Sequence, residues 1–184
     1  MDSNVVDLIM NDHRELERIF DELMTKPETR PTLVPVMITL LTAHSRAEES
    51  EVYPAAADAG GSHDVEHSQK EHLEADQLAA KVADTDFDSP DFADVLQKLI
   101  DGVKHHVEEE ESTVLPGMRE RMDDTRLEEL GQAFLRSRAE HLGDMPDDIT
   151  RSDLLQQARN VDLEGASSMS KPELKSKLED EAEL

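Results

Sequence analysis

Apolar residues recur near the start of the chain at alternating steps of three and four residues. The first such stripe consists of Ile9, Leu16, Phe20 and Leu23. His13 falls in the same series, so the spacing predicts an α-helix that runs to about Met24 with this histidine on its buried face. Asp2 and Ser3 precede the stripe and are the expected N-caps.

Three further segments show helical periodicity. One follows Pro31 and reaches about Tyr53, and the next spans about residues 64–83. The last carries the stripe Phe92, Leu96, Leu99, Val103, His106 and Glu110. Pro54 and then Gly60-Gly61 are expected to end the second helix, and Pro116-Gly117 the fourth. Four such segments joined by short turns predict an all-α, antiparallel up-down-up-down four-helix bundle.

Two additional parts follow the fourth helix. Residues 125–142 carry Leu127, Leu130 and Phe134 and are expected to pack on the bundle as an extra C-terminal helix. After a linker at residues 143–148, residues 150–184 are expected to form a small helical hairpin. We therefore predict two units, residues 1–145 and 150–184, and expect removal of the second to leave the first intact.

The composition limits the function and the location. Charged residues make up 34% of the chain, and the formal net charge is −25. This acidity argues against a phosphate backbone or an anionic membrane as the main partner. No apolar run approaches the roughly 18 residues of a membrane span, and the amino end lacks the features of a signal peptide, so a cytoplasmic location is expected. We interpret the charge as a highly soluble surface, with a salt-adapted source as the alternative.

An internal repeat carries the candidate chemistry. His44 and Glu48, four residues apart, recur as His106 and Glu110. Residues at positions i and i+4 of a helix lie one above the other, so each imidazole and carboxylate converge on one ion. Two hairpins of the same design bring both pairs to a common axis, where the carboxylates can bridge two divalent ions.

The helix before each pair also repeats. Asp12-His13 precedes the first pair, and Glu71-His72 precedes the second. The chain has no cysteine, so a metal must be held by histidine and carboxylate, which suit iron, manganese or zinc. The other four histidines share no buried stripe and are expected at the surface. They are His63, His67, His105 and His141.

These motifs resemble those of the hemerythrin-like, or HHE cation-binding, family over roughly residues 4–142. The motifs that carry the resemblance are Asp12-His13-Arg14-Glu15-Leu16, His44-x3-Glu48-Glu49-x3-Tyr53-Pro54, Glu71-His72 and His106-x3-Glu110-Glu111-x3-Leu115-Pro116. The likeness implies a four-helix bundle with two non-haem, carboxylate-bridged iron ions. It implies the terminal ligands His13, His44, His72 and His106 and the bridging ligands Glu48 and Glu110.

One position departs from the oxygen-carrying members of that family. They have a second histidine four residues after the one on the third helix, and here Asp76 stands there. Either Asp76 is a ligand, or water or Glu17 completes the shell. A further hard carboxylate favours the ferric state. The resemblance then implies reaction with peroxide, O₂ or nitric oxide, including catalase-like detoxification, rather than simple O₂ storage. The alternative is a non-enzymatic iron or oxygen sensor, or an O₂-binding protein, that acts through a partner.

Several neighbouring residues have two interpretations each. Glu49 and Glu111 either accept hydrogen bonds from ligand histidines or lie in solvent. Tyr53 either caps the pocket or only packs at a helix end. Residues 150–184 resemble the small helix-loop-helix of the transcription terminator Rho and of SAP-like modules. Because this tail is more acidic than basic, we expect it to bind a protein or to pack on the bundle, and not to bind nucleic acid.

Overall fold

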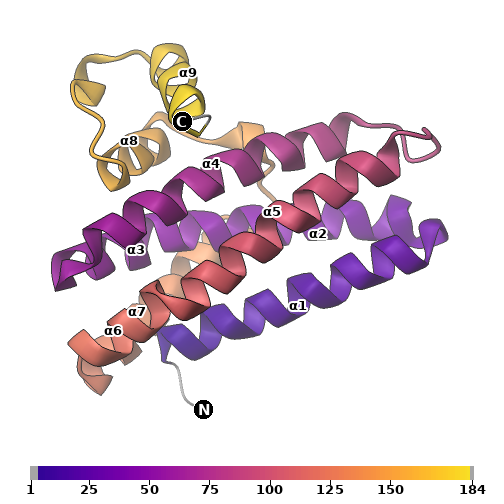
Figure 1. Cartoon of the computed structure of the whole chain (residues 1–184). Coiled ribbons are helices and arrows are strands. Elements are labelled where there is room, and N and C mark those ends of the chain that lie inside the picture. Colours follow the sequence, from indigo (N-terminus) through magenta and orange to yellow (C-terminus); the bar gives the residue numbers. More distant parts are fainter. Residues whose placement is uncertain (1–3, 183–184) are drawn as a thin grey trace.

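The computed structural model describes residues 4–182, and in that range it contains helices and turns without a strand. Its body consists of the four long helices α1 (Val5–Thr25), α2 (Arg30–Ala47), α4 (Ser62–Asp84) and α5 (Phe92–Ser112). Helix α1 packs on α2 and α5, and α4 packs on the same two helices, so the four surround one axis (Figure 1). The predicted all-α four-helix bundle is confirmed.

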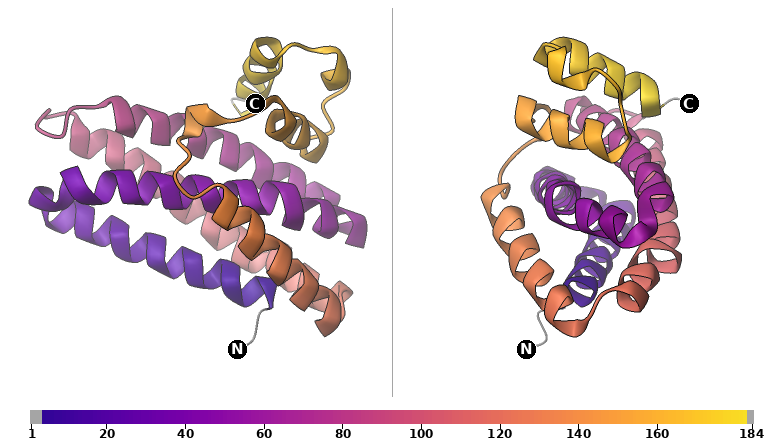
Figure 2. Two further views of the ribbon diagram at one scale, coloured as in Figure 1. Left: turned by 180° about the vertical axis from the view of Figure 1, so that it is seen from behind. Right: turned by 90° about the vertical axis from the view of Figure 1, so that its left-hand side faces the viewer.

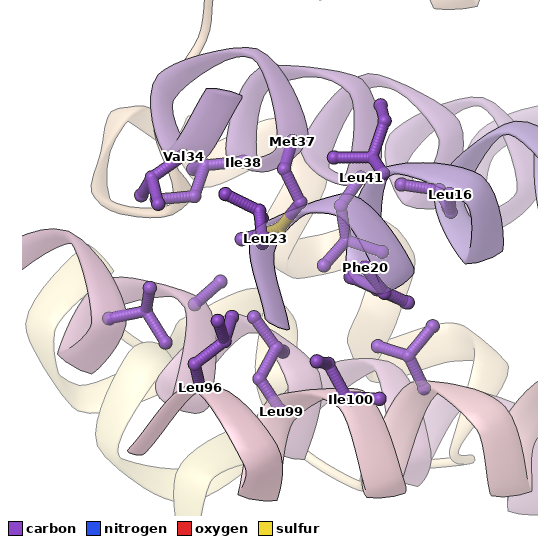
Figure 3. Close-up of a cluster of buried hydrophobic side chains, with 14 of the residues drawn as sticks. Leu16, Phe20, Leu23, Val34, Met37, Ile38, Leu41, Leu96, Leu99 and Ile100 are labelled. Atoms are coloured by element: carbon purple, nitrogen blue, oxygen red, sulfur yellow. The ribbon is translucent and has the colours of Figure 1, made fainter. Parts of the chain in front are cut away.

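The apolar stripes form two clusters, one toward each end of this bundle. The larger cluster joins the second halves of α1 and α4 to α2 and α5. Figure 3 shows Phe20 and Met37 on one side of it and Leu96 and Leu99 on the other. Each fully buried side chain of this size contributes about 1.5–3 kcal/mol to folding. The second cluster holds Ile9, Val52, Tyr53, Leu115 and Phe134 among others.

The helix ends differ in part from the prediction. The N-cap of α1 is Asn4, whose side chain accepts a hydrogen bond from the Val6 N–H at 3.0 Å. The expected caps Asp2 and Ser3 lie outside the described residues. A short 3₁₀ turn, Pro27–Thr29, joins α1 to α2.

The second helical rod does not end at Pro54. It widens into a π-type turn, Glu48–Val52, and continues as α3 (Tyr53–Ala56). Pro54 occupies the first turn of α3, where a missing N–H interrupts no intrahelical bond. A second π-type segment, Ala57–Gly61, leads into α4, and the chain reverses at Gly60, whose φ of +95° is a conformation that favours glycine.

The fourth rod also continues beyond its expected end. Helix α5 stops at Ser112, and α6 (Val114–Arg121) follows and includes Pro116 in its first turn. Helix α7 (Asp124–Glu140) then packs across α1 and α2, as Figure 2 shows. This is the predicted extra helix.

The tail forms the predicted hairpin. After the 3₁₀ turn Pro146–Asp148 come α8 (Arg151–Asn160), a second 3₁₀ turn, Ala166–Ser168, and α9 (Lys171–Ala182). Both helices lie against α4 (Figure 2). Leu154, Leu174 and Leu178 of the hairpin share one apolar cluster with Leu73 of α4. Contacts therefore cross the expected boundary, whereas independent folding of the two units stays a prediction. No described helix combines the length and apolarity that crossing a membrane requires.

Candidate metal centre

Four buried histidines meet between the two apolar clusters, one from each long helix. They are His13 of α1, His44 of α2, His72 of α4 and His106 of α5, and none is more than 6% exposed. Glu48 and Glu110 lie among them with no exposed surface. The structure thus brings together all six residues that the sequence repeat singled out.

Each carboxylate faces one histidine of its own helix and one of the other hairpin. The Oε2 atom of Glu48 lies 3.3 Å from Nε2 of both His44 and His72. The Oε2 atom of Glu110 lies 3.4 Å from His13 Nε2 and 4.0 Å from His106 Nε2. The repeat in the sequence is therefore an approximate two-fold relation in space.

The donor atoms at this centre fit a metal. Six of them are sealed from water and have no hydrogen-bond partner within residues 4–182. These atoms are His13 Nε2, His44 Nε2 and both side-chain oxygens of Glu48 and of Glu110. Unpaired carboxylate oxygens are costly in an apolar interior, and bound cations would satisfy them. Two triads of donors share Glu48, one with His13 and His44 and one with His72 and His106.

The outer nitrogen of every histidine meets a carboxylate. The Nδ1 pairs are His13 with Glu111 (2.9 Å), His44 with Asp12 (3.3 Å), His72 with Glu49 (3.3 Å) and His106 with Glu71 (2.9 Å). Such a partner holds the proton on Nδ1 and leaves Nε2 free to bind a metal. Of the two interpretations of Glu49 and Glu111, the structure favours acceptors of ligand hydrogen bonds. Asp12 and Glu71 play the same part, although the sequence analysis gave them no role.

The π-type turn that begins at Glu48 buries Glu49 as well. Arg46 and Gln69 each donate to the Glu49 carboxylate at 2.9 Å. Gln157 of α8 donates to both of its oxygens at 3.1 Å. The tail therefore reaches the carboxylate that orients His72, a contact that no local sequence signal indicates.

Asp76 and Glu17 lie outside the cluster. The Asp76 carboxylate accepts a hydrogen bond from Arg46 at 2.6 Å, and Glu17 accepts one from Arg14 at 2.7 Å on the exposed side of α1. These arginines pair with the two carboxylates that were, beside water, the alternative candidates for completing the metal shell. Tyr53 is fully buried, and its hydroxyl lies 3.0 Å from His72 Nε2, so it lines the centre.

Comparison with known proteins agrees with this geometry. The family model of the hemerythrin HHE cation binding domain matches residues 4–117. The chain belongs to this family. A curated relative of this hemerythrin-like chain, named DNA nickase, comes from Nostoc sp. (strain PCC 7120 / SAG 25.82 / UTEX 2576). It is 29% identical over 135 residues, which cover 72% of the present chain and only 38% of the relative. No solved structure gives a significant match.

The electrostatics of the hemerythrin-like centre raise the pKa of His13 and of His72 when no metal is bound, whereas burial and the neighbouring His72 lower the pKa of His106. Burial alone would lower the pKa of His13, but Glu110 and Glu48 outweigh it and raise the pKa to about 9. Burial is likewise outweighed at His72, where Glu48 and Glu49 raise the pKa to about 10. Burial would raise the pKa of Glu110, yet its contact with His13 lowers it to about 2.

These shifts predict how the stability of the metal-free domain depends on pH. Raised histidine pKa values stabilise the fold fully below the unfolded pKa of 6.5, and this contribution is lost as pH rises toward 9 and 10. The free energy of unfolding should therefore fall above pH 6.5, by about 1.4 kcal/mol per pH unit for each proton released. Urea unfolding of chelator-treated protein would measure this. A flat profile between pH 6.5 and 9 would contradict the prediction.

Proposed function

We propose that the domain holds two iron ions bridged by Glu48 and Glu110 and that this centre reacts with peroxide, O₂ or nitric oxide. The observations that carry the proposal are the six buried donor atoms that have no hydrogen-bond partner within residues 4–182 and the two donor triads that share Glu48, since each triad can hold one ion. Family membership supports a bound cation, and the nitrogen and carboxylate donors suit iron. When bound, the iron pair supplies the electrons that are exchanged with the oxidant.

The space beside the histidines supports a small reactant. A cavity of about 10 Å³ adjoins all four of them, which is room for about one water molecule. Its apolar wall consists of Leu16, Leu41, Ala75, Val103 and Val107. A diatomic gas or peroxide is of a matching size, whereas an organic substrate is not. The same wall keeps bulk water from the reactant.

The protein side chains have distinct tasks in this proposal. The four carboxylates that contact the Nδ1 atoms fix the orientation of the imidazoles. Burial, together with Glu110 and Glu48, raises the pKa of Tyr53 well above its usual value, so its hydroxyl keeps its proton. Tyr53 can therefore donate a hydrogen bond to an anion that lies beside His72.

Metal analysis and peroxide turnover test the proposal. Protein loaded with ferrous iron should hold about two irons per chain and should release O₂ from hydrogen peroxide. The variant Glu110→Ala, which removes one bridge, should hold less iron and lose the turnover. Saturation at one metal per chain, or retention of zinc alone when iron is offered, would contradict the di-iron proposal.

A sensor without turnover is the second candidate. The contact of Gln157 with Glu49 favours it, since a charge change at the centre can then reach α8. Hydrogen exchange of α8 and α9 should differ between the ferrous and ferric forms of a sensor. An enzyme would consume peroxide catalytically, and a sensor would not. We propose that the tail would pass such a change to a protein partner.

The name of the Nostoc relative raises DNA as a further partner. We propose that this chain has no nucleic-acid partner, because a net charge of −25 repels a phosphate backbone. Incubation of the metal-loaded protein with supercoiled plasmid tests this. Appearance of nicked plasmid that depends on the protein and its metal would overturn the proposal.

A further inference from the structure

A second group of histidines and carboxylates lies on the surface where α4 and α5 run side by side (Figure 1). It consists of His67 and Glu71 on α4 and His105 and Glu109 on α5. Each pair has the same four-residue spacing as the pairs of the buried centre, which places imidazole and carboxylate on one helix face. This cluster, the α4–α5 surface cluster, lies outside the repeat that forms the buried centre.

The Nε2 atoms of both histidines turn toward carboxylates of both helices. His67 Nε2 lies 2.7 Å from Glu109 Oε2 and 3.7 Å from Glu71 Oε1. His105 Nε2 lies 3.6 Å from Glu71 Oε1 and 3.5 Å from Glu109 Oε1. Donor atoms of His67, Glu71 and Glu109 lie within 4.8 Å of one another, which is within the span of one coordinated ion. The histidines are 54% and 64% exposed, so an ion can reach them from solvent.

Glu71 provides an independent observation. Its Oε2 atom accepts the hydrogen bond from Nδ1 of His106 at 2.9 Å. Its Oε1 atom is sealed from water, faces the surface cluster, and has no hydrogen-bond partner in the described part of the chain. The nearby imidazole nitrogens are too distant to supply one. A buried carboxylate oxygen in this state lacks a hydrogen-bond donor, and a bound cation would satisfy it instead.

We propose that His67, Glu71, His105 and Glu109 bind one divalent transition-metal cation, separate from the metals of the buried centre. Two imidazole nitrogens and two carboxylates form a donor set that suits zinc and its neighbours in the first transition series. Glu71 then belongs to both sites, because one oxygen ligates the surface ion and the other holds His106. The exposed histidines complete the shell by small side-chain rotations.

Zinc titration of the metal-loaded protein tests the site. The wild type should take up about one further zinc per chain while its buried metal content, measured before and after, stays constant. The double variant His67→Ala/His105→Ala loses two ligands directly, and we expect zinc affinity to fall by at least about 100-fold. The matched control His63→Ala/His141→Ala removes the two histidines that lie in neither site and should bind zinc as the wild type does.

The result is independent of the function proposed for the buried centre. The comparison between wild type and the His67/His105 variant holds whichever metal fills that centre. Circular dichroism and unchanged buried metal content would show that the variant is folded. Absence of further zinc uptake by the wild type, uptake that only replaces buried metal, or equal affinity in the double variant would each overturn the proposal.

Discussion

Replacement of His72 by alanine should remove metal from the buried centre and lower the melting temperature of the domain markedly. Its Nε2 atom faces Glu48, and its Nδ1 atom contacts Glu49. Without it, two buried carboxylates lose a partner, and a broken buried charge pair costs about 3–5 kcal/mol. Metal content by elemental analysis and thermal unfolding with and without added iron measure both effects. Metal binding stabilises the folded domain because binding and folding are coupled. The variant lacks one ligand, so added iron should not restore its melting temperature.

His63→Ala is the matched control for this experiment. His63 lies on the same helix as His72 but is exposed. Its removal should change neither metal content nor melting temperature. Equal effects of the two substitutions would show that the histidines of α4 do not have the roles assigned here.

Removal of residues 150–184 should weaken the buried centre, contrary to what the sequence boundary alone suggests. The deletion uncovers Leu73 and takes Gln157 away from the Glu49 carboxylate. The single substitution Gln157→Ala isolates the polar part of this effect. We expect it to cost about 1.5–3 kcal/mol of unfolding free energy, as for a hydrogen bond to a charged group. Metal affinity should fall by about 10-fold through the loosened support of His72.

Ser152→Ala is the control on the same helix, since Ser152 is exposed. Chelator competition and urea unfolding compare the three proteins with the wild type. The truncated protein should show the larger loss of stability, because it also loses apolar contacts. Unchanged metal affinity in the truncated protein would support the self-sufficient unit of residues 1–145.

The sequence was most informative where a property depends on positions within one helix. The stripe that carries His13 and the spacing of His44 and Glu48 follow from helical geometry alone, and these residues meet as expected. Contacts between helices cannot be predicted in this way, because they depend on which helix covers which face. Asp76 has the right spacing from His72, yet Arg46 of α2 holds it.

The dependence on how helices pack also explains why some residues were missed or given no role. Gln157 lies more than one hundred positions from Glu49, and nothing around it in the sequence points to a buried carboxylate. His67 and His105 were correctly expected at the surface, but their facing one another depends on how α4 and α5 pack. The continuation past Pro54 was missed because a π-type turn absorbs the proline without ending the rod.

The two halves of the centre have matching spacings but different surroundings. Glu49, behind His72, is 2% exposed and held by Arg46, Gln69 and Gln157. Its counterpart Glu111, behind His13, has a side chain that is 21% exposed and is paired with Arg14 at the surface. Two ions bound here would thus experience unequal electric fields. The two halves of the centre would therefore differ in their affinity for a cation, so the centre would fill in two separate steps.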